Sequence, residues 1–223
     1  MSLNKKRSLF YSVISDNPSR IFKTLSLLES SCISGIHFDA MDGTFVPRLG
    51  LYPELLGEIK RETSLFIEVH AMLSTPSFFI EKFAEAGADR IIYHIETKDN
   101  VDNLISLTKQ YGLQCGLALN PNSSTDLILP FIANIDAVML MAINPGIPKH
   151  PFIPDTYEKL QKIQSILNER GLDKEIIIDG GVTFENLENL FSYGANTLIC
   201  GSGTLFSPEK SINENLELLT SAI

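Results

Sequence analysis

Histidine and carboxylate side chains recur at the ends of β-like segments of this chain, in positions where they could form one site. His37 and Asp39 alternate with the hydrophobic residues Ile36 and Phe38. On an extended strand this alternation directs both polar side chains to the same face. Gly43 follows shortly afterwards and ends the strand. Polar side chains followed by a glycine turn are typical of an active site at the carboxyl end of a strand.

Other β-like segments also end in groups that can bind metals or transfer protons, and these groups are His70, His94, Glu96 and Asp179. A single histidine of this kind is usually a hydrogen-bonded core residue. The convergence of histidines and carboxylates instead favours a metal site, because imidazole nitrogens and carboxylate oxygens suit divalent zinc, iron, manganese or cobalt. Buried carboxylates without such a partner would be costly to desolvate. The sequence therefore predicts a site for one divalent cation.

Short β-rich segments alternate eight times with longer amphipathic segments, which is the pattern of repeated βα units. The expected strands are 9–15, 34–42, 65–70, 89–94, 113–119, 136–143, 175–179 and 196–200. The expected helices are 17–31, 53–61, 75–87, 100–111, 123–133, 154–170, 183–192 and 208–222. Glycines at three helix-to-strand junctions are expected to adopt left-handed φ; they are Gly87, Gly112 and Gly194.

Right-handed crossovers between successive parallel strands curl a sheet of this kind until it closes. We therefore expect an α/β fold, a single (β/α)8 TIM barrel that forms one domain over residues 1–223. An open, doubly wound sheet fits the same alternation and is the alternative.

The chain is acidic, with a net charge of -9, and its Lys and Arg residues are scattered. This distribution argues against nucleic acid or an anionic membrane as a partner. The apolar segments are too short to span a bilayer and no signal peptide is recognisable, so we expect a soluble, cytoplasmic protein. Cys32, Cys115 and Cys200 lack CxxC spacing and are expected to be reduced core residues.

The stretch 37–47, HFDAMDGTFVP, resembles a signature of the ribulose-phosphate 3-epimerase family, and Val69-His70-Ala71-Met72 resembles a second one. The likeness runs in order from about residue 12 to residue 206 and includes His94-Ile95-Glu96, 119–121 (LNP), 141–146 (MAINPG), 179–182 (DGGV) and Gly201-Ser202. The resemblance implies a barrel of the ribulose-phosphate-binding type. It also implies an isomerase of carbohydrate metabolism that acts at C3 of a ketose phosphate and converts D-ribulose 5-phosphate to D-xylulose 5-phosphate in pentose phosphate metabolism.

The resemblance implies that His37, Asp39, His70 and Asp179 hold the metal, and that Asp39 and Asp179 are the acid/base pair. Epimerisation beside a carbonyl removes a proton from one face of C3 and returns one to the other face. A single base would tend to restore the starting configuration, so two carboxylates are needed. A divalent cation stabilises the cis-enediolate that forms between the two proton transfers.

The residues expected to contact the substrate combine matched family positions with glycines that follow the last two strands. They are Ser12, His70, Met41, Met72, Met141, Gly146, Gly180, Gly181, Gly201 and Ser202. In the family the methionines form a thioether surface beside the planar intermediate, although core filling explains them from sequence alone equally well. The glycines would let backbone N–H groups reach a phosphate, together with the N-terminus of a short helix near residues 204–206.

The chain departs from the family after Gly146, where Ile147-Pro148-Lys149-His150 replaces the usual glycine pair and glutamine. Proline has no N–H group, so this loop cannot copy the usual amide cradle. Segments 201–206 (GSGTLF) and 151–154 (PFIP) are similar to allulose-6-phosphate 3-epimerases, which makes a six-carbon ketose phosphate the alternative substrate.

Two other functions compete with epimerisation. An aldol or decarboxylation reaction on a sugar phosphate is disfavoured, because the chain lacks the Asp-x-Lys-x-x-Asp pattern of those barrels. A binding protein with weak or no catalysis could retain the metal site despite the altered loop. The sugar phosphate is the expected small-molecule partner, and apolar residues on the outer faces of helices favour a homo-oligomer.

Overall fold

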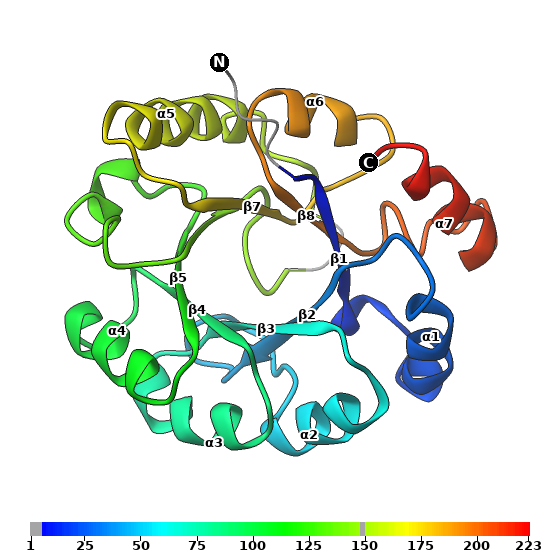
Figure 1. Cartoon of the computed structure of the whole chain (residues 1–223), viewed down its shortest axis with the longest axis horizontal. Helices are drawn as coiled ribbons and strands as arrows, with labels where there is room; N and C mark the ends of the chain where they lie inside the picture. The colour runs from blue at the N-terminus through cyan, green and yellow to red at the C-terminus, as the bar shows by residue number, and fades with distance from the viewer. Residues whose placement is uncertain (1–5, 148–149) are drawn as a thin grey trace.

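Eight parallel strands close into a barrel in the computed structural model of the chain, which describes residues 6–147 and 150–223. The strands are β1 (Ser8–Ser12), β2 (Gly35–Met41), β3 (Phe66–Met72), β4 (Arg90–His94), β5 (Gln114–Leu119), β6 (Ala137–Met141), β7 (Glu175–Asp179) and β8 (Thr197–Cys200). Each strand pairs with the next one along the chain, and β8 pairs with β1 (Figure 1). The predicted closed barrel is confirmed, and the open doubly wound sheet is excluded.

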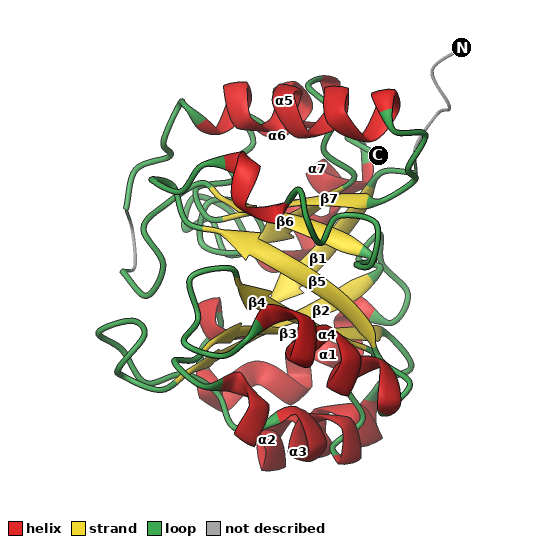
Figure 2. Cartoon of the chain, turned by 90° about the vertical axis from the view of Figure 1, so that its left-hand side faces the viewer, coloured by secondary structure: helices red, strands yellow, loops and turns green. Residues whose placement is uncertain are grey.

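Helices connect the strands and form a layer around the barrel, as the views along and across its axis show (Figures 1 and 2). The α-helices are α1 (Ile21–Leu28), α2 (Pro53–Glu62), α3 (Ile80–Glu85), α4 (Val101–Gln110), α5 (Thr156–Glu169), α6 (Leu187–Ser192) and α7 (Ile212–Thr220). The 3-10 turns are η1 (Val13–Ser15), η2 (Pro18–Arg20), η3 (Pro76–Phe78) and η4 (Thr125–Ile128). None of the helices in the described residues is long and apolar enough to cross a membrane.

Two predicted helices are wrong. The segment expected to be a helix at 123–133 forms only η4, because Pro130 lacks the N–H group that would continue the helical hydrogen bonds. The segment near 204–206 consists of turns, so the predicted helix N-terminus beside the phosphate does not form. The predicted first strand also extends too far, since β1 ends at Ser12 and continues as η1.

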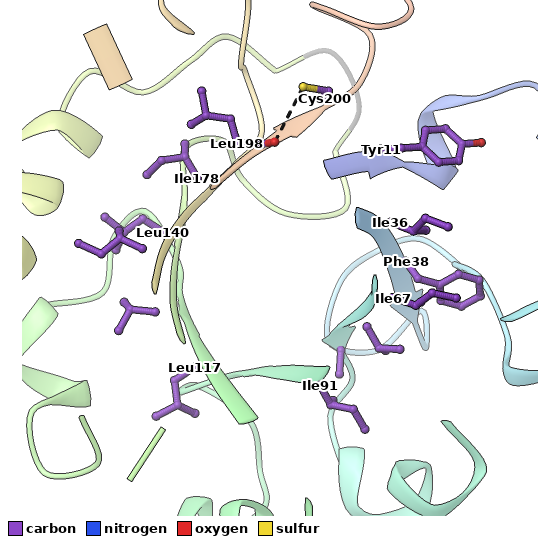
Figure 3. Close-up of a cluster of buried hydrophobic side chains, with 14 of the residues drawn as sticks. Tyr11, Ile36, Phe38, Ile67, Ile91, Leu117, Leu140, Ile178, Leu198 and Cys200 are labelled. Carbon is purple, nitrogen blue, oxygen red and sulfur yellow. Dashed lines mark hydrogen bonds between the residues drawn. The ribbon is translucent and has the colours of Figure 1, made fainter. Parts of the chain in front are cut away.

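The two largest clusters of the hydrophobic core lie on opposite sides of the strands. Side chains such as Ile36, Phe38 and Ile178 extend from the strands toward the helices (Figure 3). A smaller cluster that includes Ile92 and Met139 fills the barrel interior. Each such Ile or Leu side chain contributes about 1.5–3 kcal/mol when it is fully buried.

The glycines and cysteines adopt the backbone conformations and environments that the sequence predicts. The three junction glycines adopt positive φ, with 97° at Gly87, 75° at Gly112 and 112° at Gly194. Cys115 and Cys200 are buried, Cys32 is half-buried, and all three are free.

The strand register brings polar residues together on the inner wall of the barrel. In the β2–β3 pair, His37 lies opposite Glu68 and Asp39 lies opposite His70. In the β6–β7 pair, Met141 lies opposite Asp179. Because residues two apart on a strand share a face, His37 and Asp39 both face the barrel interior and belong to two successive layers of side chains there.

Candidate active site

His37, Asp39, His70 and Asp179 form one cluster in the barrel interior, contributed by β2, β3 and β7. One potential ligand atom from each of these residues lies within 4.8 Å of the others. Asp39 Oδ1 lies 3.3 Å from His37 Nε2 and 3.2 Å from His70 Nδ1. Asp179 Oδ2 lies 3.8 Å and 3.5 Å from the same two nitrogens. The structure thus brings together all four residues that the family resemblance implies as metal ligands.

The atoms of this cluster fit a divalent cation. His37 is fully buried, and within the described residues its Nε2 atom has no hydrogen-bond partner although two carboxylates surround it. The Nδ1 atom of the same ring hydrogen-bonds to Glu68 Oε1 at 2.8 Å, which leaves Nε2 as the free ligand atom. Two imidazole nitrogens and two carboxylate oxygens are a common donor set for zinc, iron, manganese or cobalt.

The two carboxyl groups of the cluster have pKa values displaced in opposite directions. Burial opposes ionisation of Asp39, but the nearby charges of His37 and His70 and the hydrogen bond with His70 outweigh it and hold the Asp39 pKa well below its usual range. Burial and the neighbouring Asp39 charge raise the pKa of Asp179. Such a divergence suits one group to accept a proton and the other to donate one.

The pKa of His37 is raised well above its ordinary value. Burial lowers it, and the nearby charges of Asp39 and Asp179 more than compensate. The shift favours the protonated form of His37 in the metal-free protein, and a cation bound at its Nε2 atom would compete with a proton there.

A buried ionic pair supports the His/Asp cluster, and the sequence analysis missed it. Glu68 is fully buried and Arg90 is 2% exposed. Arg90 Nε donates to Glu68 Oε2 at 2.7 Å, and a second guanidinium N–H donates to Glu175. The signal was present, because Glu68-x-His70 repeats on β3 the alternation of His37-x-Asp39. Glu68 accepts a hydrogen bond from His37 Nδ1–H and fixes the orientation of its ring.

Two polar residues near the site have other partners. Asp42 accepts hydrogen bonds from the N–H groups of Thr44 and Phe45, and its second oxygen accepts from the Ser74 N–H at 2.7 Å. It therefore joins the loops after β2 and β3. His94 lies against His70 on one side and against the Glu96 carboxylate on the other, and burial lowers the pKa of His94 to about 4.

A cavity of about 590 Å³ opens over the cluster and is lined by Asp39 and Asp179. Nine of the residues expected to contact the substrate line it: Ser12, Met41, Met72, Met141, Gly146, Gly180, Gly181, Gly201 and Ser202. His70, the remaining residue of the ten expected to contact the substrate, is fully buried and does not line the cavity. The sequence analysis missed Arg48, Thr183 and Asn186, which also line the cavity.

Glycine lets the backbone approach the cavity closely at two of these positions. A Cβ atom at Gly201 would lie 2.6 Å from Ser15 Oγ. Gly180 has a φ of 90°, and a Cβ atom there would overlap the Ile143 side chain. In the atypical loop, Ile147 and His150 line the cavity, whereas Pro148 and Lys149 lie outside the described residues.

Comparison with known proteins identifies relatives over most of the chain. Residues 8–205 match the model of the ribulose-phosphate 3 epimerase family. The chain is 38% identical over 194 residues to a ribulose-phosphate 3-epimerase of Chlamydia trachomatis, covering 86% of this chain and 82% of the relative. It is 32% identical over 192 residues to the ribulose-phosphate 3-epimerase of Bacillus subtilis, covering 86% and 88%.

Solved structures with much lower sequence identity share the fold. A tryptophan synthase α-subunit variant from Pyrococcus furiosus superposes with a TM-score of 0.70 at 17% identity, covering 98% of this chain and all (100%) of that chain. A phosphoribosyl anthranilate isomerase from Thermus thermophilus superposes with a TM-score of 0.69 at 16% identity, covering 96% and 97%.

Proposed function

Because the chain belongs to the ribulose-phosphate 3-epimerase family, whose named members are isomerases, we propose that it interconverts D-ribulose 5-phosphate and D-xylulose 5-phosphate by metal-dependent epimerisation at C3. The observation that carries this proposal is the meeting of Asp39 and Asp179 at one cavity, from strands on opposite sides of the barrel.

One divalent cation, which is zinc, iron, manganese or cobalt, is held by His37, Asp39, His70 and Asp179. The orphaned His37 Nε2 atom and the two adjacent carboxylates support this assignment. When bound, the cation supplies positive charge that stabilises the negative charge developing on the substrate oxygens during proton removal. Proton transfer itself is assigned to the side chains of the protein.

Asp39 and Asp179 act as the acid/base pair on opposite faces of C3. In the metal-free protein the pKa of Asp39 is lowered and that of Asp179 is raised, so the two carboxyl groups differ in their tendency to hold a proton. In the reverse direction the two roles exchange. Met41, Met72 and Met141 line the cavity next to these carboxylates, where their apolar side chains exclude water from the planar cis-enediolate.

The phosphate lies beside the loops after β7 and β8. Gly180, Gly181, Gly201 and Ser202 line the cavity at these loops, and their backbone N–H groups and the Ser202 hydroxyl are the proposed phosphate donors. Asn186 supports this loop, since its side chain accepts from the Thr183 N–H and donates to the Gly181 carbonyl, each at 2.9 Å. Ser12, at the end of β1, and Gly146, in the loop after β6, contact the remainder of the substrate.

D-allulose 6-phosphate is the second candidate substrate. The segment 151–154 that is similar to the allulose-6-phosphate 3-epimerases contributes Pro151 and Phe152 to the cavity wall. These residues lie beside the expected phosphate loops, where a sixth carbon would shift the phosphate. Phe152 also contacts the position where Gly181 would carry a Cβ atom.

The proposal is tested by incubating purified protein with each sugar phosphate after loading with Zn²⁺, Fe²⁺, Mn²⁺ or Co²⁺. We expect turnover of ribulose 5-phosphate that is lost in the Asp179→Asn variant. Faster turnover of allulose 6-phosphate would identify the second candidate as the substrate. Metal binding without turnover of either sugar would contradict catalysis and support a binding protein.

We further propose a homo-oligomer that resides in the cytoplasm. Exposed apolar residues such as Leu49, Tyr52 and Phe78 support self-association. Sedimentation analysis of the purified chain measures the number of subunits.

A further inference from the structure

We propose that His94 and Glu96 are positioning residues, which hold His70 in the tautomer and ring orientation that present its Nδ1 atom to Asp39 and Asp179. The inference rests on the proposed metal site, in which His70 is a ligand. It assigns a role to the two polar residues at the end of β4 that the proposed reaction does not otherwise use.

The two imidazole rings meet through their Nε2 atoms, 2.9 Å apart. Both side chains are fully buried, so water cannot take the place of either partner. The rings are stacked, with centroids 5.0 Å apart and an interplanar angle of 23°. A hydrogen bond between two ring nitrogens requires one of them to carry a proton and the other to offer a lone pair.

Glu96 determines which nitrogen donates. Its Oε2 atom lies 3.3 Å from His94 Nδ1, and an ionised carboxylate can only accept hydrogen bonds. Nδ1 of neutral His94 therefore carries the proton, and its Nε2 atom offers a lone pair. His70 must then donate from Nε2, which leaves Nδ1 as the atom that faces Asp39 at 3.2 Å and Asp179 at 3.5 Å.

Contacts on the far side of Glu96 hold the carboxylate in place. Its Oε1 atom accepts from the Asn120 N–H at 3.0 Å and from the Ser123 hydroxyl. Lys159 of α5 fixes the same loop, because its ammonium donates to the carbonyls of Asn120 and Ser123 at 3.2 and 2.7 Å. The Phe45 ring packs on His94 with centroids 4.8 Å apart.

A Glu96→Gln substitution tests this arrangement. Both carboxylate oxygens of Glu96 accept hydrogen bonds, whereas a glutamine amide has only one acceptor oxygen. Either the Asn120 N–H or the His94 Nδ1–H then faces an NH₂ group. Substitution of a residue that hydrogen-bonds to a metal-bound histidine typically lowers metal affinity by about 10–100-fold. We expect a decrease of this size in Co²⁺ affinity, measured by chelator competition. The matched control is Glu62→Gln at the exposed end of α2, which should bind Co²⁺ as the unmodified protein does.

Substitutions at His94 separate positioning from packing. His94→Gln retains an acceptor for His70 and a donor for Glu96, so Co²⁺ affinity should stay within about 10-fold of the unmodified protein. His94→Phe retains the ring but has no acceptor, and it should lose about 10–100-fold. Equal Co²⁺ affinity in both variants would contradict the inference.

The tautomers can also be read directly in the metal-free protein by NMR of ¹⁵N-labelled histidine. We expect His94 to be protonated on Nδ1 alone and His70 to carry a proton on Nε2. Protonation of His94 on Nε2 would overturn the inference even if Glu96→Gln failed to fold. If the unmodified protein bound no Co²⁺, the proposed metal site would fail, whereas the NMR result would still decide the direction of the hydrogen bonds.

Discussion

Replacement of Arg90 by Met should destabilise the barrel strongly, because it leaves the charge of Glu68 without its main partner. Arg90 is 2% exposed and Glu68 is fully buried, and the two are joined at 2.7 Å. Removing one member of a buried ion pair typically costs about 3–5 kcal/mol. In a protein of this size each kcal/mol lowers Tm by about 2–4 °C, so the expected decrease is about 6–20 °C.

Denaturant unfolding of the metal-free protein measures this free energy, with Arg61→Met as the control. Arg61 pairs with Glu58 on the surface of α2, where the two side chains are 64% and 59% exposed. Loss of that pair should cost less than about 1 kcal/mol. A Glu68→Gln/Arg90→Met double variant should recover much of the loss, since the neutral amide can still accept from His37 Nδ1.

The reasoning would be refuted if Arg90→Met destabilised the protein no more than Arg61→Met does. Failure of the double variant to recover stability would also contradict it. In that case the packing of Arg90 over the Phe10 and Phe66 rings, at 5.9 and 5.1 Å, would account for the effect instead of the charge.

Two further predictions concern the phosphate loop and the metal. Gly180→Ala should raise KM for the sugar phosphate by about 10-fold or more, because residue 180 has a φ of 90° and its new Cβ atom would overlap the Ile143 side chain. The control is Gly112→Ala, at a φ of 75° with no atom within 4 Å of the new Cβ atom. Equal KM values in the two variants would count against the assignment of the phosphate loop. Metal affinity should increase from about pH 6 to pH 8, because the cation must displace the proton that Asp39 and Asp179 stabilise on His37. Calorimetry in buffers of different ionisation enthalpy should detect about one proton released per cation at neutral pH, and no release would disagree with the raised pKa of His37.

The fold could be predicted from the sequence because strand periodicity and junction glycines are local signals. The eight βα units determine a closed barrel once right-handed crossovers are required. Helix lengths were harder to predict. Ser124 is a polar N-cap that signals the start of a helix, but the helical turn that follows it ends before Pro130, which has no N–H group to continue the hydrogen bonds.

The members of the His/Asp cluster were accessible from the strand-end residues together with the family resemblance, whereas the contacts that support the cluster were not. His37 and Asp39 reveal a shared face through their spacing on one strand. The partners of the histidines depend instead on register between strands, which places Glu68 beside His37 and Arg90 beside Glu68. Local periodicity contains no information on register, so these pairs required the structure.

Epimerisation by two carboxylates is tested most directly by following C3 in D₂O with metal-loaded protein and ribulose 5-phosphate. The account predicts that each xylulose 5-phosphate molecule formed carries deuterium at C3, because Asp179 exchanges its proton with solvent before returning one to the substrate. The Asp179→Asn variant, at saturating metal, should form no epimer. Formation of xylulose 5-phosphate that retains the original C3 proton, or undiminished epimerisation by Asp179→Asn, would contradict the central claim.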